Sequence, residues 1–242
     1  MTEEVLAHES LPASRPSAGE TRGPVAPGDA SARFLVVLDV DSTLIENEVI
    51  EMLADAAGSH ALVAGITERA MSGEIDFAES LRERVATLAG LPDSVFEEVR
   101  AAVEVTRGVP EMIAGLHASG SLVGVVSGGF HEILDPLAES LGLDFWRANR
   151  LGVADGVLTG SVSGPIVDPQ SKADALTEWA ASAGVPLSRT VAVGDGANDL
   201  RMMEIAGLSV AFDARPVVRT SADLALNDRD LSALLPLLGL RG

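Results

Sequence analysis

The 242-residue sequence has no cysteine and only one lysine. Without cysteine the chain can form no disulfide, and it offers neither a thiolate nucleophile nor a thiolate metal ligand. This absence fits a reducing compartment, so we expect the protein in the cytoplasm. The other basic residues are all arginine, which makes Lys172 the single exception to a strong preference.

Long apolar runs are also missing. No run approaches the ~20 residues that a membrane span needs, and the N-terminus shows no basic region followed by an apolar stretch. The net charge is -19, which disfavours binding to nucleic acid or to an anionic membrane. We therefore expect neither partner, and a phosphate ester could be bound only where positive charge is concentrated locally.

Residues 1–32 contain proline among serine, glycine, alanine and glutamate without apolar periodicity, which predicts a disordered tail. The apolar run at 34–38 predicts a strand buried on both faces. Four consecutive helical patterns follow with no strand between them, starting near Ile45 and ending near residue 104. This order predicts an inserted helical cap over 46–106.

The core is expected to comprise residues 33–45 and 107–242. From residue 107 onward, helices alternate with short apolar strands, which is typical of a mainly parallel sheet with helices on both faces. A small β-hairpin is predicted around 149–163, turning at Asp155-Gly156. Ser171 is expected to cap the helix that follows the hairpin.

Three predicted strands end in polar turns: D-V-D-S-T at 39–43, S-G-G at 127–129 and G-D-G-A-N-D at 194–199. Ligands of such sheets bind beyond the carboxyl ends of the strands. The fold should therefore bring together one serine and four carboxylates, namely Ser127, Asp39, Asp41, Asp195 and Asp199. The carboxylates would repel one another unless a cation binds, and an all-oxygen site on a phosphate substrate favours Mg²⁺.

Each turn also has a simpler interpretation. Asp-x-Asp after a strand is usually a turn or a helix cap, and Gly194 and Gly196 match half of a dinucleotide-binding Gly-x-Gly-x-x-Gly pattern. The dinucleotide interpretation fails because Asp195 would point negative charge at a pyrophosphate and Asp199 replaces the third glycine. Other catalytic signatures, such as His-Glu-x-x-His, a Walker loop or Gly-x-Ser-x-Gly, are missing from the sequence.

The ordered set of Asp-x-Asp-Ser-Thr, Ser-Gly-Gly, the lone Lys172 and Gly-Asp-Gly-x-Asn-Asp resembles the haloacid dehalogenase (HAD) superfamily. Within it, the chain resembles the phosphoserine phosphatase family over about 33–236. The segments that carry this resemblance are N-E-V-I at 47–50, S-L-R-E-R-V at 80–85, V-V-S-G-G-F at 125–130 and A-N-R-L at 148–151.

This resemblance implies an α/β fold, a HAD-like (Rossmann-like) core with an inserted helical-bundle cap. It implies an enzyme that hydrolyses O-phospho-L-serine to L-serine and phosphate, the last step of serine biosynthesis. The reaction would pass through an aspartyl-phosphate and require Mg²⁺. The chain would act as a monomer or a homodimer.

The resemblance also assigns the chemical roles. Asp39 would be the nucleophile, and Asp41 the general acid and then the base. Lys172 would lie between carboxylate and phosphate, where a compact ammonium fits better than a planar guanidinium. Asp39, Asp195 and the main-chain carbonyl of Asp41 would coordinate Mg²⁺, and Asp199 would act on the metal indirectly.

Substrate binding is assigned in the same way. The phosphate would contact Ser127, the Gly128 amide and Asn198, together with Lys172. At the serine end, the ammonium would pair with Glu48 and the carboxylate with Arg84, and Met71 and Phe77 would line the pocket. The cap would then close over the substrate and exclude water.

Two alternatives remain open from the sequence. The substrate could be another small phosphorylated metabolite, such as phosphohomoserine or phosphothreonine, because the sequence does not give the pocket size. The chain could also be a catalytically inactive binding protein that keeps the fold, although the retained Asp39, Asp41, Lys172 and Asp195 argue against this. Taken alone, Lys172 could be a solvated surface charge.

Overall fold

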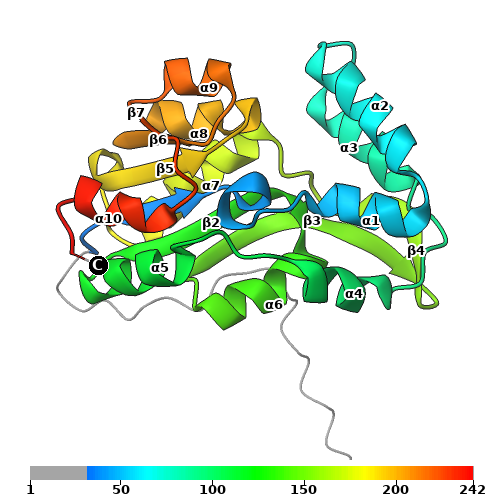
Figure 1. The fold of residues 1–242 in the computed structure, drawn as a ribbon, viewed down its shortest axis with the longest axis horizontal. Coiled ribbons are helices and arrows are strands. Elements are labelled where there is room, and N and C mark those ends of the chain that lie inside the picture. The colour runs from blue at the N-terminus through cyan, green and yellow to red at the C-terminus, as the bar shows by residue number, and fades with distance from the viewer. Residues whose placement is uncertain (1–31, 242) are drawn as a thin grey trace, which may run out of the picture.

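The computed structural model describes residues 32–241, so all but the last residue of the predicted tail over 1–32 lies outside the described part. The described residues form a seven-stranded sheet of order β4-β3-β2-β1-β5-β6-β7 (Figure 1). All neighbouring strands are parallel except β3 and β4. The strands are β1 (Leu35–Leu38), β2 (Leu122–Phe130), β3 (Phe145–Ala154), β4 (Val157–Ser163), β5 (Thr190–Gly194), β6 (Leu208–Phe212) and β7 (Leu224–Leu226).

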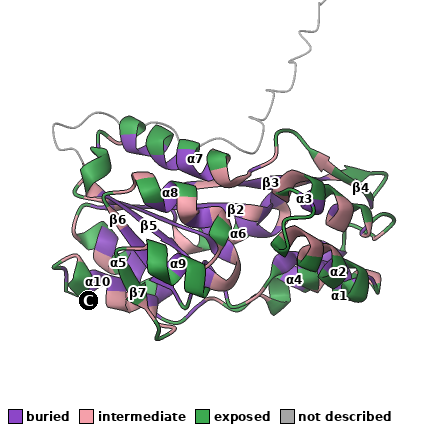
Figure 2. Ribbon diagram, turned by 90° about the horizontal axis from the view of Figure 1, so that it is seen from above, coloured by how far each residue is buried: buried purple, intermediate pink, exposed green. Residues whose placement is uncertain are grey.

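Helices cover both faces of the sheet, as the alternation of elements predicts. Alternate residues of β1 point to opposite sides. Val36 and Leu38 pack in one cluster with α5 (Val109–Ala118), α6 (His131–Leu141) and α10 (Leu234–Leu237). Leu35 and Val37 pack in another cluster with α7 (Pro169–Ser182), α8 (Leu200–Ile205) and α9 (Pro216–Ser221). Figure 2 shows the buried strands enclosed between helices with exposed outer faces.

Four helices lie between β1 and β2: α1 (Val49–Ala57), α2 (His60–Met71), α3 (Phe77–Ala86) and α4 (Val95–Ala102). The α2–α3 pair projects from the rest of the molecule, whereas α1 and α4 lie closer to the sheet (Figure 1). The chain enters and leaves this segment side by side, because Ile45 bridges Val105 and the Glu46 N–H donates to the Glu104 carbonyl at 2.8 Å. The division into a core and a separate cap stays a prediction.

Two expected helix starts are wrong. The helical pattern read from Ile45 begins only at Val49, because Ile45 is extended and pairs with Val105. The preceding residues 40–44 form a wide turn whose backbone is not helical at Asp41 and Ser42, and Ser42 adopts a left-handed conformation with φ 57°. The cap of α7 is Asp168 rather than Ser171, because the Asp168 carboxylate accepts the Ser171 N–H at 2.8 Å.

Strand limits differ as well. β2 does not end before Ser-Gly-Gly but continues to Phe130, with a register shift against β3 after Val126. β3 already begins at Phe145, so one strand serves as both a parallel sheet member and the first arm of the hairpin. The hairpin turns at Asp155 and Gly156, both with positive φ. Among residues 32–241 there is no helix long and apolar enough to cross a membrane.

Candidate active site

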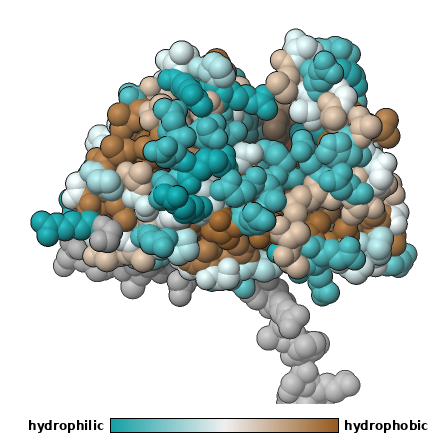
Figure 3. All heavy atoms as spheres, viewed as in Figure 1, coloured by the Kyte–Doolittle hydropathy of each residue, from teal (hydrophilic) through white to brown (hydrophobic). Residues whose placement is uncertain are grey.

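The three polar segments belong to three adjacent strands at the centre of the sheet: Asp39 follows β1, Asp195 follows β5, and residues 127–129 lie near the end of β2. β1 lies between β2 and β5, so Asp39, residues 127–129 and Asp195 meet at one edge. A cavity of about 740 Å³ opens above this edge. In Figure 3 it is visible as a recess between the projecting α2–α3 pair and the rest of the molecule.

Residues from both sides line the cavity. The sheet side contributes Asp39, Asp41, Gly128, Gly129, Pro169, Asp195, Gly196, Ala197, Asn198, Arg215, Pro216 and Val217. The helical segment contributes Glu48, Ile50, Thr67, Ala70, Met71, Phe77, Ser80, Leu81 and Arg84. The cavity therefore joins polar strand ends to a wall made by α1, α2 and α3.

A buried ion-pair cluster forms the floor of the site. Lys172 Nζ lies 2.7 Å from Asp39 Oδ1 and 2.8 Å from Asp199 Oδ1. Lys172 and Asp199 are both 0% exposed, which excludes the interpretation of Lys172 as a surface charge. Burial alone would lower the pKa of Lys172, but the charges of Asp199 and Asp39 raise it above its usual value. The lysine therefore stays a cation beside the Asp39 carboxylate.

Asp199 is fixed from a second direction. Its Oδ2 accepts the Gly196 N–H at 3.1 Å, so the carboxylate bridges the turn after β5 and the lysine of α7. The turn can approach so closely only because residue 194 is glycine, since a side chain there would overlap the Asp199 carboxylate. Glycine is therefore required at position 194 because a side chain would overlap Asp199, in addition to the chemical role expected for Asp195.

Three carboxylates gather where a cation could bind. One oxygen from each of Asp39, Asp195 and Asp199 lies within 4.8 Å of the others. Burial and the charges of Asp39 and Glu48 raise the pKa of Asp195 to about 6. A bound cation would relieve this repulsion, and the hard oxygen donors suit a divalent metal. The Thr43 hydroxyl donates a hydrogen bond to Asp195 Oδ1 at 3.2 Å, which further orients this carboxylate.

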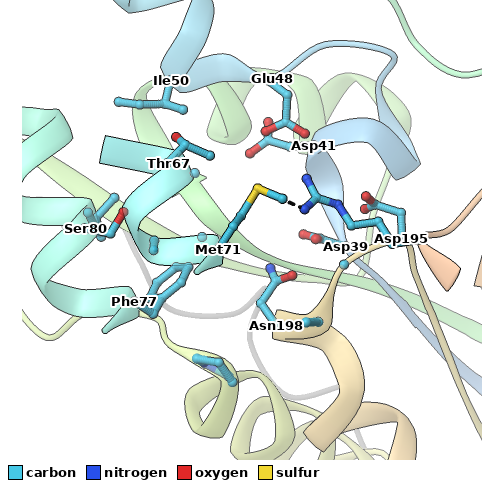
Figure 4. Close-up of a pocket in the computed structure, with 18 of the residues that line it drawn as sticks. Asp39, Asp41, Glu48, Ile50, Thr67, Met71, Phe77, Ser80, Asp195 and Asn198 are labelled. Atoms are coloured by element: carbon cyan, nitrogen blue, oxygen red, sulfur yellow. Dashed lines mark hydrogen bonds between the residues drawn. The ribbon is translucent and has the colours of Figure 1, made fainter. Parts of the chain in front are cut away.

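Asp41 faces the cavity beside Glu48 (Figure 4). Burial raises the pKa of Asp41 well above its usual value, and the charges of Glu48 and Asp39 raise it further. The crowding expected from the sequence is therefore present, but burial is the larger cause. The carboxylate is held by the Val49 N–H, which donates to Oδ1 at 3.2 Å. The raised pKa favours the protonated carboxyl group that a general acid needs.

The Ser127 side chain is buried rather than part of the cavity lining. Its hydroxyl accepts the Gly129 N–H at 2.7 Å, which fixes the backbone near the end of β2. Gly128 lies at the cavity, and its carbonyl accepts the Asn149 side-chain amide at 2.9 Å. Asn198 also lines the cavity. These groups lie on the same side as Asp39.

The opposite wall carries Glu48 and Arg84. Within residues 32–241, neither side chain has an ion-pair partner within 4.0 Å. Burial raises the pKa of Glu48 and lowers that of Arg84. Glu48 is accessible through the cavity although protein surrounds it closely. Both groups therefore gain from a ligand that carries the opposite charge.

The apolar part of this wall comes from Met71 and Phe77, both labelled in Figure 4. Met71 is exposed at the end of α2, and Phe77 begins α3. The Phe77 ring lies so close to Gly128 that a β-carbon there would meet Phe77 Cζ at 2.9 Å. The helical wall thus contacts the end of β2 directly.

Of the residues singled out from the sequence, all lie at this cavity or just beneath it. Sequence reasoning missed the groups that position them. Ser42 donates its hydroxyl to Glu48 Oε1 at 2.7 Å, and Arg229 Nη2 donates to the Ser42 carbonyl at 3.2 Å. Ser42, Thr43 and Asn149 stand inside the quoted motifs, so the signal was present, whereas Arg229 and Arg215 lie outside every motif.

Comparison with known proteins agrees with this geometry. Residues 36–204 match the profile of haloacid dehalogenase-like hydrolases. A phosphoserine phosphatase of Streptococcus thermophilus is 51% identical over 86% of this chain and 97% of its own length. One of Streptomyces coelicolor is 56% identical over 86% of this chain but only 51% of its own length. This chain thus spans nearly all of one relative and about half of the other.

A solved structure of a substrate-bound phosphoserine phosphatase complex superimposes with a TM-score of 0.81 at 41% identity, covering 86% of this chain and 99% of the other. The fold and the acidic site define a HAD-family hydrolase, a phosphatase whose carboxylate cluster suits a metal. Within that class, the chain belongs to the phosphoserine phosphatase family.

Proposed function

We propose that the enzyme hydrolyses O-phospho-L-serine to L-serine and phosphate through an aspartyl-phosphate on Asp39. One observation carries the proposal above all others. A single cavity joins the buried Asp39–Lys172 pair to Glu48 and Arg84, a carboxylate and a guanidinium that have no ion-pair partner in the described part of the chain. Phosphoserine supplies the matching phosphate, ammonium and carboxylate.

In the first step, an Asp39 oxygen attacks phosphorus and the bond from phosphorus to the serine oxygen breaks. The serine oxygen takes the proton held by Asp41, whose raised pKa suits this role. Lys172 holds Asp39 Oδ1 in place together with the Val40 N–H, which donates to the same oxygen at 2.7 Å. This fixed orientation lowers the entropic part of the barrier.

In the second step, Asp41 takes a proton from water as the water oxygen attacks phosphorus. The bond between phosphorus and the Asp39 oxygen breaks, which releases phosphate and restores both carboxyl groups. The same side chain thus serves as acid and then as base. Gly128 and Asn198 would bind phosphate oxygens, and Ser127 would act mainly by fixing the backbone near the end of β2 through its bond to the Gly129 N–H.

Mg²⁺ is the metal we propose, held by Asp39, Asp195 and the Asp41 carbonyl, with Asp199 acting through Lys172 and Gly196. When bound, it would neutralise charge on the phosphate. At the serine end, Glu48 would pair with the ammonium and Arg84 with the carboxylate, whose geometry suits a bidentate contact. We further propose that residues 46–106 act as the cap and that the enzyme is cytoplasmic.

The test is phosphate release from a panel of phosphoserine, phosphothreonine, phosphohomoserine and p-nitrophenyl phosphate. Phosphoserine should give the highest kcat/KM. EDTA should abolish turnover, and added Mg²⁺ should restore it. A higher kcat/KM for another member of the panel would reassign the substrate, and turnover that survives exhaustive chelation would contradict the metal requirement.

A further inference from the structure

One cationic side chain that lines the cavity has no role in the mechanism proposed above. Its lining contains four carboxylates, on Asp39, Asp41, Glu48 and Asp195. Two guanidiniums lie among the lining residues, and the roles proposed above use only Arg84. The second belongs to Arg215. The chain has a net charge of -19, so a cation at the cavity is placed where it can attract an anionic ester against the overall negative charge.

The backbone fixes Arg215 beside the metal-binding side of the cavity. Its N–H donates to the Asp195 carbonyl at 3.1 Å, so the loop after β6 is tied to the turn after β5. Pro216 follows at the first position of α9, which restricts the backbone further. The arginine is therefore placed next to Asp195 by local structure rather than by a flexible loop.

The Arg215 side chain reaches across the mouth of the cavity without meeting a carboxylate. Its Nη1 contacts Met71 Sδ at 3.2 Å, shown as a dashed line in Figure 4. Within residues 32–241 no carboxylate lies within 4.0 Å of this guanidinium, whereas the nearby Arg219 and Arg229 both pair with Asp213. A thioether is a weak acceptor. Among residues 32–241 it is the only side-chain partner of Arg215, so the other N–H groups of the guanidinium stay available to an anion that enters the cavity.

We propose that Arg215 is a substrate-binding residue whose guanidinium binds the phosphate group of the incoming ester at the mouth of the cavity. This inference rests on the proposed phosphatase function and adds a second cation to it. Arg84 belongs to α3 and shares its wall with Glu48, the side assigned to the serine end. Arg215 belongs to the side of Asp195 and Asp39, which the phosphate must reach, so the two guanidiniums recognise different ends of one substrate.

The contact with Met71 gives this binding a second effect. Met71 ends α2, whereas Arg215 precedes α9, so the pair spans the two sides of the cavity. Arg215 bound to phosphate stays beside Met71, which keeps the apolar wall over the reacting group. The residue acts during capture of the substrate, because Lys172 and Asp41 already provide the groups for the chemical step.

The test compares the Arg215→Gln variant with the wild type on phosphoserine and on p-nitrophenyl phosphate, which has no carboxylate or ammonium. We expect kcat/KM to fall by about tenfold or more on both substrates, with most of the change in KM. The dependence of kcat/KM on salt should become weaker. Arg215→Lys should recover part of the loss, because it keeps the charge but not the planar geometry.

Arg201→Gln is the matched control. Arg201 is exposed on α8 and does not line the cavity, and within residues 32–241 its side chain donates only to that of Gln170, at 2.7 Å. The Arg201→Gln variant removes the same charge as Arg215→Gln and from the same half of the molecule. Its kcat/KM should stay within about twofold of the wild type, because charge far from the substrate is screened.

Binding of inorganic phosphate to the Mg²⁺-loaded enzyme, measured by calorimetry, provides a readout without turnover. The dissociation constant should rise in Arg215→Gln and not in Arg201→Gln. Unchanged KM and phosphate affinity would overturn the inference, as would a loss confined to phosphoserine or equal losses in kcat and kcat/KM. If the wild type hydrolyses neither ester, the proposed function fails, while the phosphate titration still decides the role of Arg215.

Discussion

The two sides of the cavity are built in opposite ways. On the sheet side, Lys172 and Asp199 are fully buried, and Lys172 pairs with Asp39 and Asp199 at hydrogen-bond distance. On the helical side, Glu48 and Arg84 face the cavity without an ion-pair partner among residues 32–241. The chemical groups are therefore organised before substrate arrives, whereas the groups that would recognise the serine end are completed only by the substrate.

This difference follows from where each side is placed. The catalytic groups stand at the ends of β1 and β5 or on α7, all within the packed sheet and its helices. Rigid supports favour accurate geometry for reacting groups. The recognition groups stand at the start of α1 and on α3, in the segment joined to the sheet by two adjacent connections. Substitutions on the two sides should therefore have different consequences.

Asp39→Asn should have the largest effect. The amide cannot attack phosphorus, so kcat should fall by at least about 10⁴-fold on every substrate. Phosphate-release kinetics provide the measurement, and far-UV circular dichroism checks that the fold is retained. Substantial turnover by the folded variant would show that the reaction does not need Asp39 as its nucleophile.

Lys172→Arg should come next. The larger, planar guanidinium does not fit the fully buried space between Asp39 and Asp199, and displacement of the nucleophile by ~1 Å can cost ~100-fold in rate. We expect at least that loss in kcat on all substrates. Overpacking should also lower the free energy of unfolding by about 1–3 kcal/mol. Near-normal kcat would contradict the proposed placement of Lys172 in the chemical step.

Arg84→Ala and Glu48→Gln should separate the two sides of the cavity. Each should lower kcat/KM for phosphoserine by about 30-fold or more, because the substrate would bury a charge without its partner. p-Nitrophenyl phosphate should be affected much less, since it lacks both serine-end charges. The ratio of the two kcat/KM values is the measurement. An unchanged ratio would mean that these residues support the helical wall rather than recognise serine.

Asp168→Ala should have the smallest effect. Asp168 caps α7 by accepting both the N–H and the hydroxyl of Ser171 at 2.8 Å, and loss of such a cap costs about 1 kcal/mol. Asp168 lies four residues before Lys172 and does not line the cavity, so kcat should change little. Urea unfolding should show the lower free energy of unfolding. A large fall in kcat at full stability would place Asp168 among the groups that position Lys172.

The sequence predicted the sheet side well. Short apolar runs followed by Asp39, Ser127 and Gly194 locate β1, β2 and β5, although β2 extends further than predicted, and adjacency of parallel strands then brings these polar residues together. The lone lysine could be placed only by resemblance, because the contacts of Lys172 with Asp39 and Asp199 cross long stretches of chain. The local signal was ambiguous even for Ser171, where the true cap, Asp168, lies three residues earlier.

The helical side was predicted less completely. Glu48 and Arg84 look like solvated helix charges in the sequence, and no periodicity indicates that they face one cavity. Arg215 was missed because its role depends on the Asp195 carbonyl and Met71, neither of which is near it in sequence. Side-chain positions set by tertiary contacts carry no local pattern that sequence reasoning can use.

Rapid quenching of the wild type during turnover of phosphoserine, followed by peptide mass spectrometry, tests directly whether Asp39 carries the phosphoryl group. We expect a phosphoryl group on Asp39 that forms and decays fast enough to account for turnover, and that is not found in Asp39→Asn. A phosphoryl group on Ser127 or another residue, or turnover with no phosphoenzyme under any quench condition, would contradict this expectation.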